Sequence, residues 1–165
     1  MIRMHRGVAV AAVHIAIVAS LGAKLMVDRA TRPRVWARTA PVDPNAPIRG
    51  RYVSLRVEAA IDPQLNLGSS VQDVGLRVED GRLVAASPAG PQVLSGWAVQ
   101  RPNGERVAVL AEPVAYFIPE HAPDPSRRPA GEELWVEVTI PRRGTPRPIR
   151  LGVKKDGVLT PLDLK

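Results

Sequence analysis

Two patterns of apolar positions divide the chain near residue 28. An unbroken apolar stretch comes first, and many short segments in which apolar and polar residues alternate follow it. No residue from Val8 to Ala23 is charged, and the stretch counted to Val27 has 20 residues, the length that a helix needs to cross a bilayer. Lys24 lies near its end, where a long cationic side chain can reach the membrane interface. The pattern predicts one N-terminal transmembrane helix.

Two other interpretations of residues 1–27 stay open from the sequence. A basic start, a short apolar core and small residues at a cleavage point are typical of a signal peptide, and Ser20 and Ala23 offer such points. A buried helix of a soluble protein is the other. A literal positive-inside count favours a cytoplasmic domain. A short tail before an apolar core is typical of exported proteins, and on that ground we expect a single-pass membrane protein with a periplasmic domain.

Period-two alternation dominates the chain from residue 51 onward. In the segment 52–58 the apolar residues Val53, Leu55 and Val57 fall on one face. Similar segments flank three turn pairs that predict hairpins, Asp80-Gly81, Asn103-Gly104 and Asp156-Gly157. Further strands are predicted at 114–118 and 134–140, and no segment shows helical periodicity. The sequence therefore predicts a mainly β domain, a small barrel or sandwich of about eight to ten short strands.

An Arg- and Pro-rich connector, residues 28–50, joins the two parts. Its middle, residues 34–42, is predicted to form a first strand. Pro41, Pro44 and Pro47 then fix φ repeatedly and hold their predecessors extended, which favours a semi-rigid strut. The predicted organisation is a membrane anchor or signal peptide at 1–27, the connector at 28–50 and a β-domain at 51–165.

Composition and charge narrow the classes of function. The chain has three Trp, two Tyr and one Phe, so the core must consist mainly of Val, Leu, Ile and Ala, and the lack of Cys excludes a thiolate zinc site and a cysteine nucleophile. Residues 1–51 carry nine Lys/Arg and two acidic residues, whereas residues 52–165 carry 14 of each. A basic flank beside an apolar segment attracts anionic lipid. We expect no nucleic-acid partner, because that would need positive charge on the folded domain.

The polar residues form no strong catalytic or metal-binding set. A metal site would have to use three residues of one proline-rich loop, Glu120, His121 and Asp124, which is a poor ligand set. We therefore expect no metal and no cofactor. Ser54 with Lys154 or Lys155 has the residue types of a Ser-Lys hydrolase, which stays open as an alternative. The expectation from the residues is a protein that is not an enzyme.

Two stretches resemble the bacterial GDYXXLXY proteins. PVDPNAPIRGRYVSLRV (residues 41–57) resembles their Pro-Val-Asp-Pro followed by Arg-Gly-Asp-Tyr-Val-x-Leu-x-Tyr, with matches at Pro41, Val42, Asp43, Pro44, Arg49, Gly50, Tyr52, Val53 and Leu55. AYFIPEH (residues 115–121) resembles their Tyr-Phe-Val-Pro-Glu-Gly, and a late Val-x-Val matches at Val136 and Val138. The chain departs from the pattern at Arg51, where the family has Asp, and at Val57, where the family has Tyr.

The resemblance implies a small membrane-anchored bacterial protein without an assigned activity, often encoded beside multi-pass membrane proteins. We expect a non-catalytic accessory or interaction module of a membrane complex, which contacts lipid through residues 7–27 and has a multi-pass membrane protein as a partner. The candidate binding residues are Asp43, Arg49, Tyr52, Tyr116, Phe117 and Glu120.

We hypothesise that four of these residues form one polar patch: Arg49, Tyr52, Tyr116 and Glu120. The other interpretation is that Tyr116 or Phe117 anchors the core. An alternative function is a periplasmic binding module for a small ligand or cell-wall fragment, with a pocket beside Tyr116 and the 121–131 loop. The Ser-Lys hydrolase is the second alternative.

Overall fold

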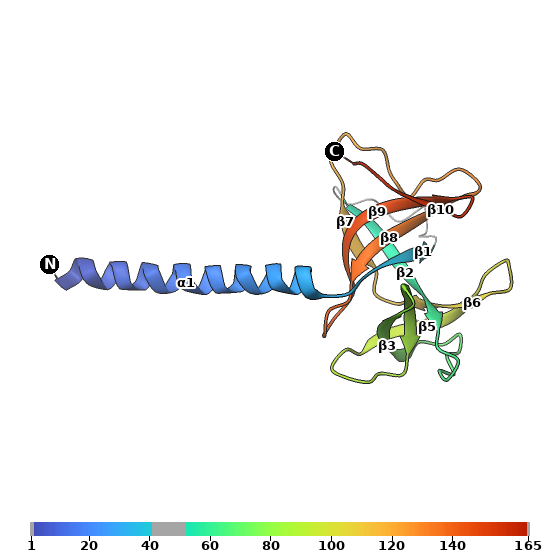
Figure 1. Cartoon of the computed structure of the whole chain (residues 1–165), viewed down its shortest axis with the longest axis horizontal. Coiled ribbons are helices and arrows are strands. Elements are labelled where there is room, and N and C mark those ends of the chain that lie inside the picture. Colours follow the sequence, from blue (N-terminus) through green and yellow to red (C-terminus); the bar gives the residue numbers. More distant parts are fainter. Residues whose placement is uncertain (1, 41–51, 165) are drawn as a thin grey trace. The chain divides into compact units, whose positions relative to one another are not determined.

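The computed structural model describes residues 2–40 and 52–164 and divides the chain into two compact units, Met1–Arg32 and Pro33–Lys165 (Figure 1). The first unit contains the helix α1, and the described part of the second contains ten strands. The elements are α1 (Ile2–Thr31), β1 (Arg34–Ala40), β2 (Tyr52–Ile61), β3 (Gln72–Glu79), β4 (Arg82–Ala86), β5 (Leu94–Gln100), β6 (Arg106–Leu110), β7 (Val114–Phe117), β8 (Glu132–Thr139), β9 (Arg147–Lys155) and β10 (Val158–Pro161).

Helix α1 contains the apolar stretch, and its segment Gly7–Val27 is long and apolar enough to cross a membrane. Two polar side chains of this segment hydrogen-bond within the helix. His14 Nδ1 donates to the carbonyl of Val10 at 2.8 Å, and Ser20 Oγ donates to that of Ile17 at 2.8 Å. Such bonds satisfy polar groups without water, as a lipid environment requires.

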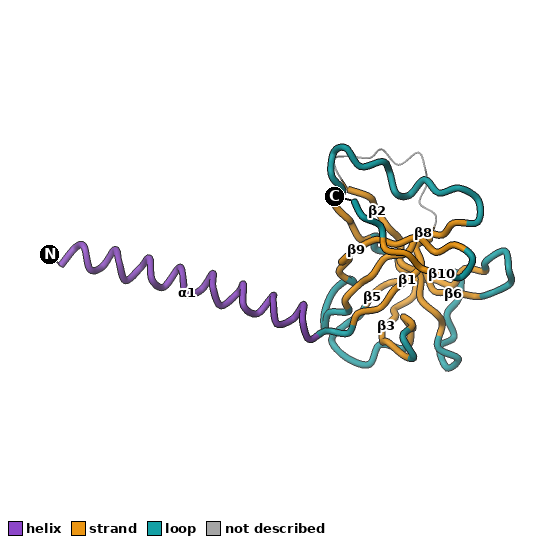
Figure 2. The backbone as a smooth tube through the Cα atoms, turned by 45° about the horizontal axis from the view of Figure 1, so that its top comes forward, coloured by secondary structure: helices purple, strands orange, loops and turns teal. Residues whose placement is uncertain are grey.

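The ten strands form one sheet in the order β10-β9-β8-β1-β2-β4-β3-β5-β6, with β7 paired to β2 (Figures 1 and 2). Strand β2 is central because its two halves have different neighbours. Residues Tyr52–Leu55 pair with β7, and Arg56 and Val57 pair with β1. Residues 58–60 pair with β6, and residues 60 and 61 pair in parallel with β4. The strand predicted at 34–42 is β1, whose residues 34–38 pair with β8 and whose last two pair with β2. Residues 41 and 42 of the predicted strand lie outside the described residues.

The mainly β fold and its strand number agree with the sequence-based prediction, and the sheet contains a ring of pairings, β2-β4-β3-β5-β6. This ring is not a barrel. Strand β2 joins it only through residues 58–61, and β1, β7, β8, β9 and β10 pair outside it. The hairpin turns lie where the turn pairs predict them, with positive φ at Asp80, Gly81, Asp156 and Gly157.

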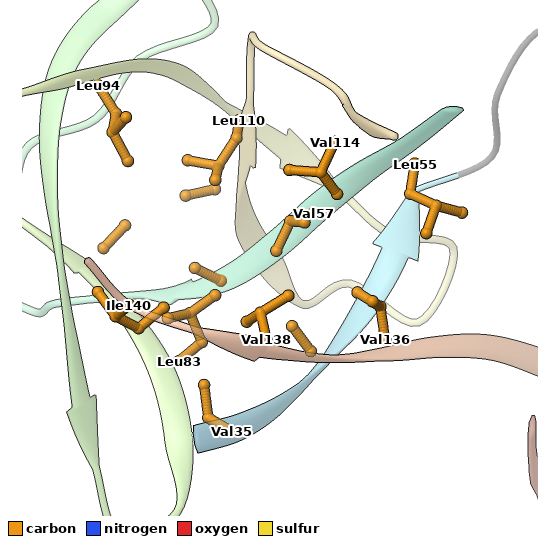
Figure 3. Close-up of a cluster of buried hydrophobic side chains, with 14 of the residues drawn as sticks. Val35, Leu55, Val57, Leu83, Leu94, Leu110, Val114, Val136, Val138 and Ile140 are labelled. Carbon is orange, nitrogen blue, oxygen red and sulfur yellow. The ribbon is translucent and has the colours of Figure 1, made fainter. Parts of the chain in front are cut away.

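The core is aliphatic, as the composition predicts. Alternate residues of β1, β2 and β8 point into it, together with two residues each of β4 and β6 and one each of β3, β5, β7 and β9 (Figure 3). Leu55, Val57, Val136 and Leu151 are almost completely buried. Tyr116 packs against the edge of this cluster, which otherwise consists of Val, Leu, Ile and Ala. The three tryptophans lie elsewhere.

Candidate functional site

Strand pairing brings together two of the residues predicted from the sequence. Tyr52 of β2 lies directly opposite Phe117 of β7, and their ring centroids are 6.1 Å apart in an edge-to-face arrangement. Phe117 is 77% exposed. Both rings lie on the outer face of the sheet, which means the face opposite to the hydrophobic core. They form an aromatic contact of the kind that stabilises cross-strand pairs.

The other predicted residues are not part of this contact. Tyr116 lies opposite Val53, so its side chain is on the core face, away from Tyr52. This position agrees with the interpretation that Tyr116 anchors the core. Glu120 is exposed in the loop after β7 and has an interaction partner. Asp43 and Arg49 lie outside the described residues.

A second outer-face feature was not predicted from the sequence. Trp36 of β1 and Trp135 of β8 are half-buried on the outer face, because their neighbours Val35, Ala37 and Val136 occupy the core face. The alternation of β1 does indicate that Trp36 is on the outer face, because its neighbours Val35 and Ala37 are buried on the other face. What the alternation does not give is the set of residues that contact the ring across the sheet.

Each of these tryptophans is covered by a cation from β9. The Arg150 guanidinium lies 5.3 Å from the centroid of the Trp36 ring, and the Lys154 ammonium lies 4.7 Å from that of Trp135. The Trp36 ring passes over Gly152, where a Cβ would come within 2.9 Å of a ring carbon. We call this surface, made of Trp36, Trp135, Arg150, Gly152 and Lys154, the tryptophan face.

Carboxylates hold the tryptophan face in place. Arg150 Nε donates to Glu137 at 2.6 Å, and the Trp135 indole N–H donates to Glu133 at 3.0 Å. The Arg150 guanidinium and the Trp135 indole N–H on this face therefore have defined directions. A set of aromatic rings and guanidinium groups with fixed orientations is the composition of energetically dominant protein–protein contacts.

A network of charges continues from the tryptophan face towards β6. Glu58 of β2 is buried and accepts hydrogen bonds from Arg101 Nε, at 3.1 Å, and from Arg101 Nη2. Arg38 lies between Glu58 and Glu133, with nitrogen–oxygen distances of 4.0 and 3.3 Å. The third tryptophan, Trp97, lies on the same outer face under Arg56, 5.7 Å from the ring centroid.

Two pKa values in this network are shifted. Burial disfavours the charged guanidinium of Arg101, but hydrogen bonds and charges from Glu58 and Glu105 outweigh that effect and raise its pKa above the ordinary value. Burial also opposes the charged form of Glu105. The charge of Arg101 and hydrogen bonds from Arg101 and Asn103 outweigh it, so the pKa of Glu105 is lowered. Both groups are held in their charged forms.

Two of the hollows lined by described residues adjoin the sheet. A groove of about 500 Å³ lies between residues 86–92 and 140–142, and a smaller hollow of about 170 Å³ lies beside Ser126 and Arg128 of the 121–131 loop. The smaller one is below the usual size of a small-molecule site, about 300–1,000 Å³, and Tyr116 lines neither.

The residues weighed for chemistry occupy other roles. Within residues 2–40 and 52–164, no three His, Asp or Glu side chains are grouped so as to hold a metal ion. Asp124 accepts hydrogen bonds from the backbone and hydroxyl of Ser126. Lys154 covers Trp135, and Lys155 lies 3.4 Å from Glu132. Among the described contacts, neither lysine hydrogen-bonds Ser54.

The family model described as "GDYXXLXY protein" matches residues 14–151. The chain belongs to this family. The match extends from α1 into β9, so it includes Trp36, Trp135 and Arg150 as well as the two stretches that resemble the family's motifs. Searches of curated proteins and of solved structures each found no match to this GDYXXLXY protein.

Proposed function

We propose that this GDYXXLXY protein is a single-pass membrane protein whose β-domain is a non-catalytic interaction module, with the tryptophan face as its binding surface for a partner protein in the same membrane. One observation carries the proposal. All three Trp of the chain lie outside the core, and two of them, Trp36 and Trp135, lie on one side of three adjacent strands. A tryptophan contributes its large area most effectively to stability when it is buried.

The chemistry of the surface supports a protein partner. Trp and Arg are enriched at the centres of protein interfaces, where water is excluded around them. On the tryptophan face the rings are already oriented by Arg150, Lys154, Glu133 and Glu137, so binding would order few side chains. The multi-pass partner implied by the family resemblance fits this proposal, because α1 would place both proteins in one bilayer.

Photocrosslinking in native membranes tests the surface. A photoreactive residue at Lys154 is expected to give an adduct of one defined mass, and the same residue at Arg82, exposed at the start of β4, is not. Trp36→Ala should weaken the adduct about tenfold or more, the effect of losing one dominant contact residue. Trp97→Ala is the matched control and should leave it unchanged. Equal adducts from Lys154 and Arg82, or insensitivity to Trp36→Ala, would contradict the proposal.

We further propose that the β-domain lies outside the cytoplasm. A reporter that is active only outside the cytoplasm, fused after Lys165, is expected to be active in the membrane fraction. Activity in the soluble periplasm would mean that residues 1–23 are removed as a signal peptide, and the small-ligand alternative would then be favoured. A silent but stable membrane-bound fusion would place the domain in the cytoplasm.

A further inference from the structure

Two loops of the β-domain are tied together by one buried amide. Residues 87–93 connect β4 to β5, and residues 141–146 connect β8 to β9. The side chain of Gln92 is buried between them and makes three hydrogen bonds: Nε2 donates to the carbonyls of Pro141 at 3.0 Å and Gly144 at 3.1 Å, and Oε1 accepts from the backbone N–H of Leu76 at 3.3 Å. The two loops therefore form one surface. We call residues 87–93 and 141–147 the paired-loop surface.

One half of the paired-loop surface is basic. Residues 141–147 contain the exposed Arg142, Arg143 and Arg147 and no acidic residue. Arg34 of β1 and Arg147 of β9 both pair with Thr139 of β8, so Arg34 extends the same row across three strands. Among the described ion pairs none involves Arg142, Arg143 or Arg147. Residues 52–165 carry equal numbers of basic and acidic residues, so the charges of residues 141–147 are segregated rather than spread.

The other half is uncharged and exposed. Residues 87–93 are Ser-Pro-Ala-Gly-Pro-Gln-Val, and all except Gln92 are exposed, with Val93 51% exposed. The groove of about 500 Å³ separates this loop from Ile140 and Arg142. An apolar loop beside a basic loop matches the two layers of a membrane interface, in which apolar groups enter and cations stay with the phosphates.

The chain also enters the sheet at this end. Helix α1 ends at Thr31 and β1 begins at Arg34, and the carbonyl of Pro33 accepts a hydrogen bond from the backbone N–H of Ile140 at 3.4 Å. Pro33 is the residue at which the chain enters the domain, and Ile140 is hydrogen-bonded to it. Pro141, in the basic loop, follows Ile140 directly. A tethered surface meets its binding partner at high effective concentration, so weak contacts suffice.

We propose that the paired-loop surface docks on the anionic phospholipid headgroups of the bilayer that α1 crosses. The proposal rests on the membrane-spanning part of the proposed function and concerns a different surface from the tryptophan face. Arg142, Arg143 and Arg147 contact lipid phosphates, and residues 87–91 enter the headgroup layer. Anionic lipid is favoured over a protein partner because the contacts are supplied by exposed arginines, which take part in none of the described ion pairs, beside an uncharged loop.

Full-length chain in nanodiscs tests this directly, because the absence of native Cys allows single-cysteine labelling. An environment-sensitive fluorophore at Gly90→Cys reports from the uncharged loop, and one at Val158→Cys, at the start of β10, is the control. Gly90 tolerates a side chain, since no atom lies within 4 Å of an added Cβ. In discs with phosphatidylglycerol, the emission at position 90 is expected to rise several-fold and shift to the blue relative to phosphatidylcholine discs. Emission at position 158 should not change.

Charge variants identify the cause. Arg142→Gln with Arg143→Gln should abolish the lipid-dependent signal, and Arg127→Gln with Lys155→Gln, which also removes two exposed charges, should preserve it. High salt should weaken the signal through screening. Equal emission in the two lipids, or equal loss in the two double variants, would overturn lipid docking. If the chain inserts into discs but gives one of these results, lipid docking is contradicted and the proposed function is unaffected. If carbonate extracts the chain from membranes, the membrane-spanning anchor itself is contradicted.

Discussion

Replacing Arg101 by Met is expected to destabilise the β-domain by about 2–4 kcal/mol, the cost of leaving a buried carboxylate without its main partner. Glu58 is 8% exposed and receives two hydrogen bonds from Arg101. The remaining cation, Arg38, is 4.0 Å away and also serves Glu133, so it compensates only in part. Thermal unfolding of the full chain in detergent, followed by near-ultraviolet circular dichroism, should show a midpoint lower by roughly 10 °C.

Two further variants test whether stability is lost because a buried carboxylate is left unpaired or merely because an arginine is removed. Arg82→Met removes an exposed arginine and should change stability by less than about 0.5 kcal/mol. Glu58→Leu combined with Arg101→Met should recover most of the loss, because no unpaired carboxylate then remains in the interior. A double variant no more stable than Arg101→Met would contradict this account of the network.

The second large effect is expected at Gly152. A Cβ at this position would lie 2.9 and 3.0 Å from two carbons of the Trp36 ring and 3.1 Å from the carbonyl oxygen of Thr160. Gly152→Val should therefore cost about 1–3 kcal/mol through overpacking. It should also displace the Trp36 ring from under Arg150. Thermal unfolding measures the first effect, and a change in tryptophan emission measures the second.

The control for Gly152→Val is Gly90→Val, at a position with open space around it. It should be nearly neutral. Trp36→Ala provides the decisive comparison, since Gly152→Val should cost less in that background, with the contact to the Thr160 carbonyl remaining. An unchanged cost would show that the ring is not what Gly152 accommodates. Because Gly152→Val disturbs the tryptophan face, it should also weaken the crosslink from Lys154.

The strands could be predicted from the sequence, because the alternation of apolar and polar residues within a strand indicates which face is buried. Alternation located β2 and β8, and the Asp-Gly pairs located two hairpin turns. Strand order is a different matter. The parallel contact of β2 with β4 and the division of β2 between four neighbours depend on long-range packing that no local pattern encodes.

The sequence identified single residues of the candidate site, but not which of them lie together in space. The hypothesised patch placed Tyr116 beside Tyr52, but Tyr116 points to the core face, and only the register shows that Phe117 meets Tyr52. The tryptophan face needs more still, because Trp36 and Gly152 come from strands at opposite ends of the domain's sequence. A glycine in β9 gave no sign that a ring would lie over it.

The position of β1 sets the order in which this protein can mature. Its hydroxyl-bearing residue Thr39 donates to the carbonyl of Leu134 at 2.9 Å, across 95 residues of chain. At synthesis rates of about 5–20 residues per second, β8 leaves the ribosome roughly 5–20 s after β1. Throughout that interval only Thr39 and Ala40, which pair with β2, have a strand to join, and residues 34–38 have none. The strand that follows the apolar helix is therefore fully paired only after β8 has been made.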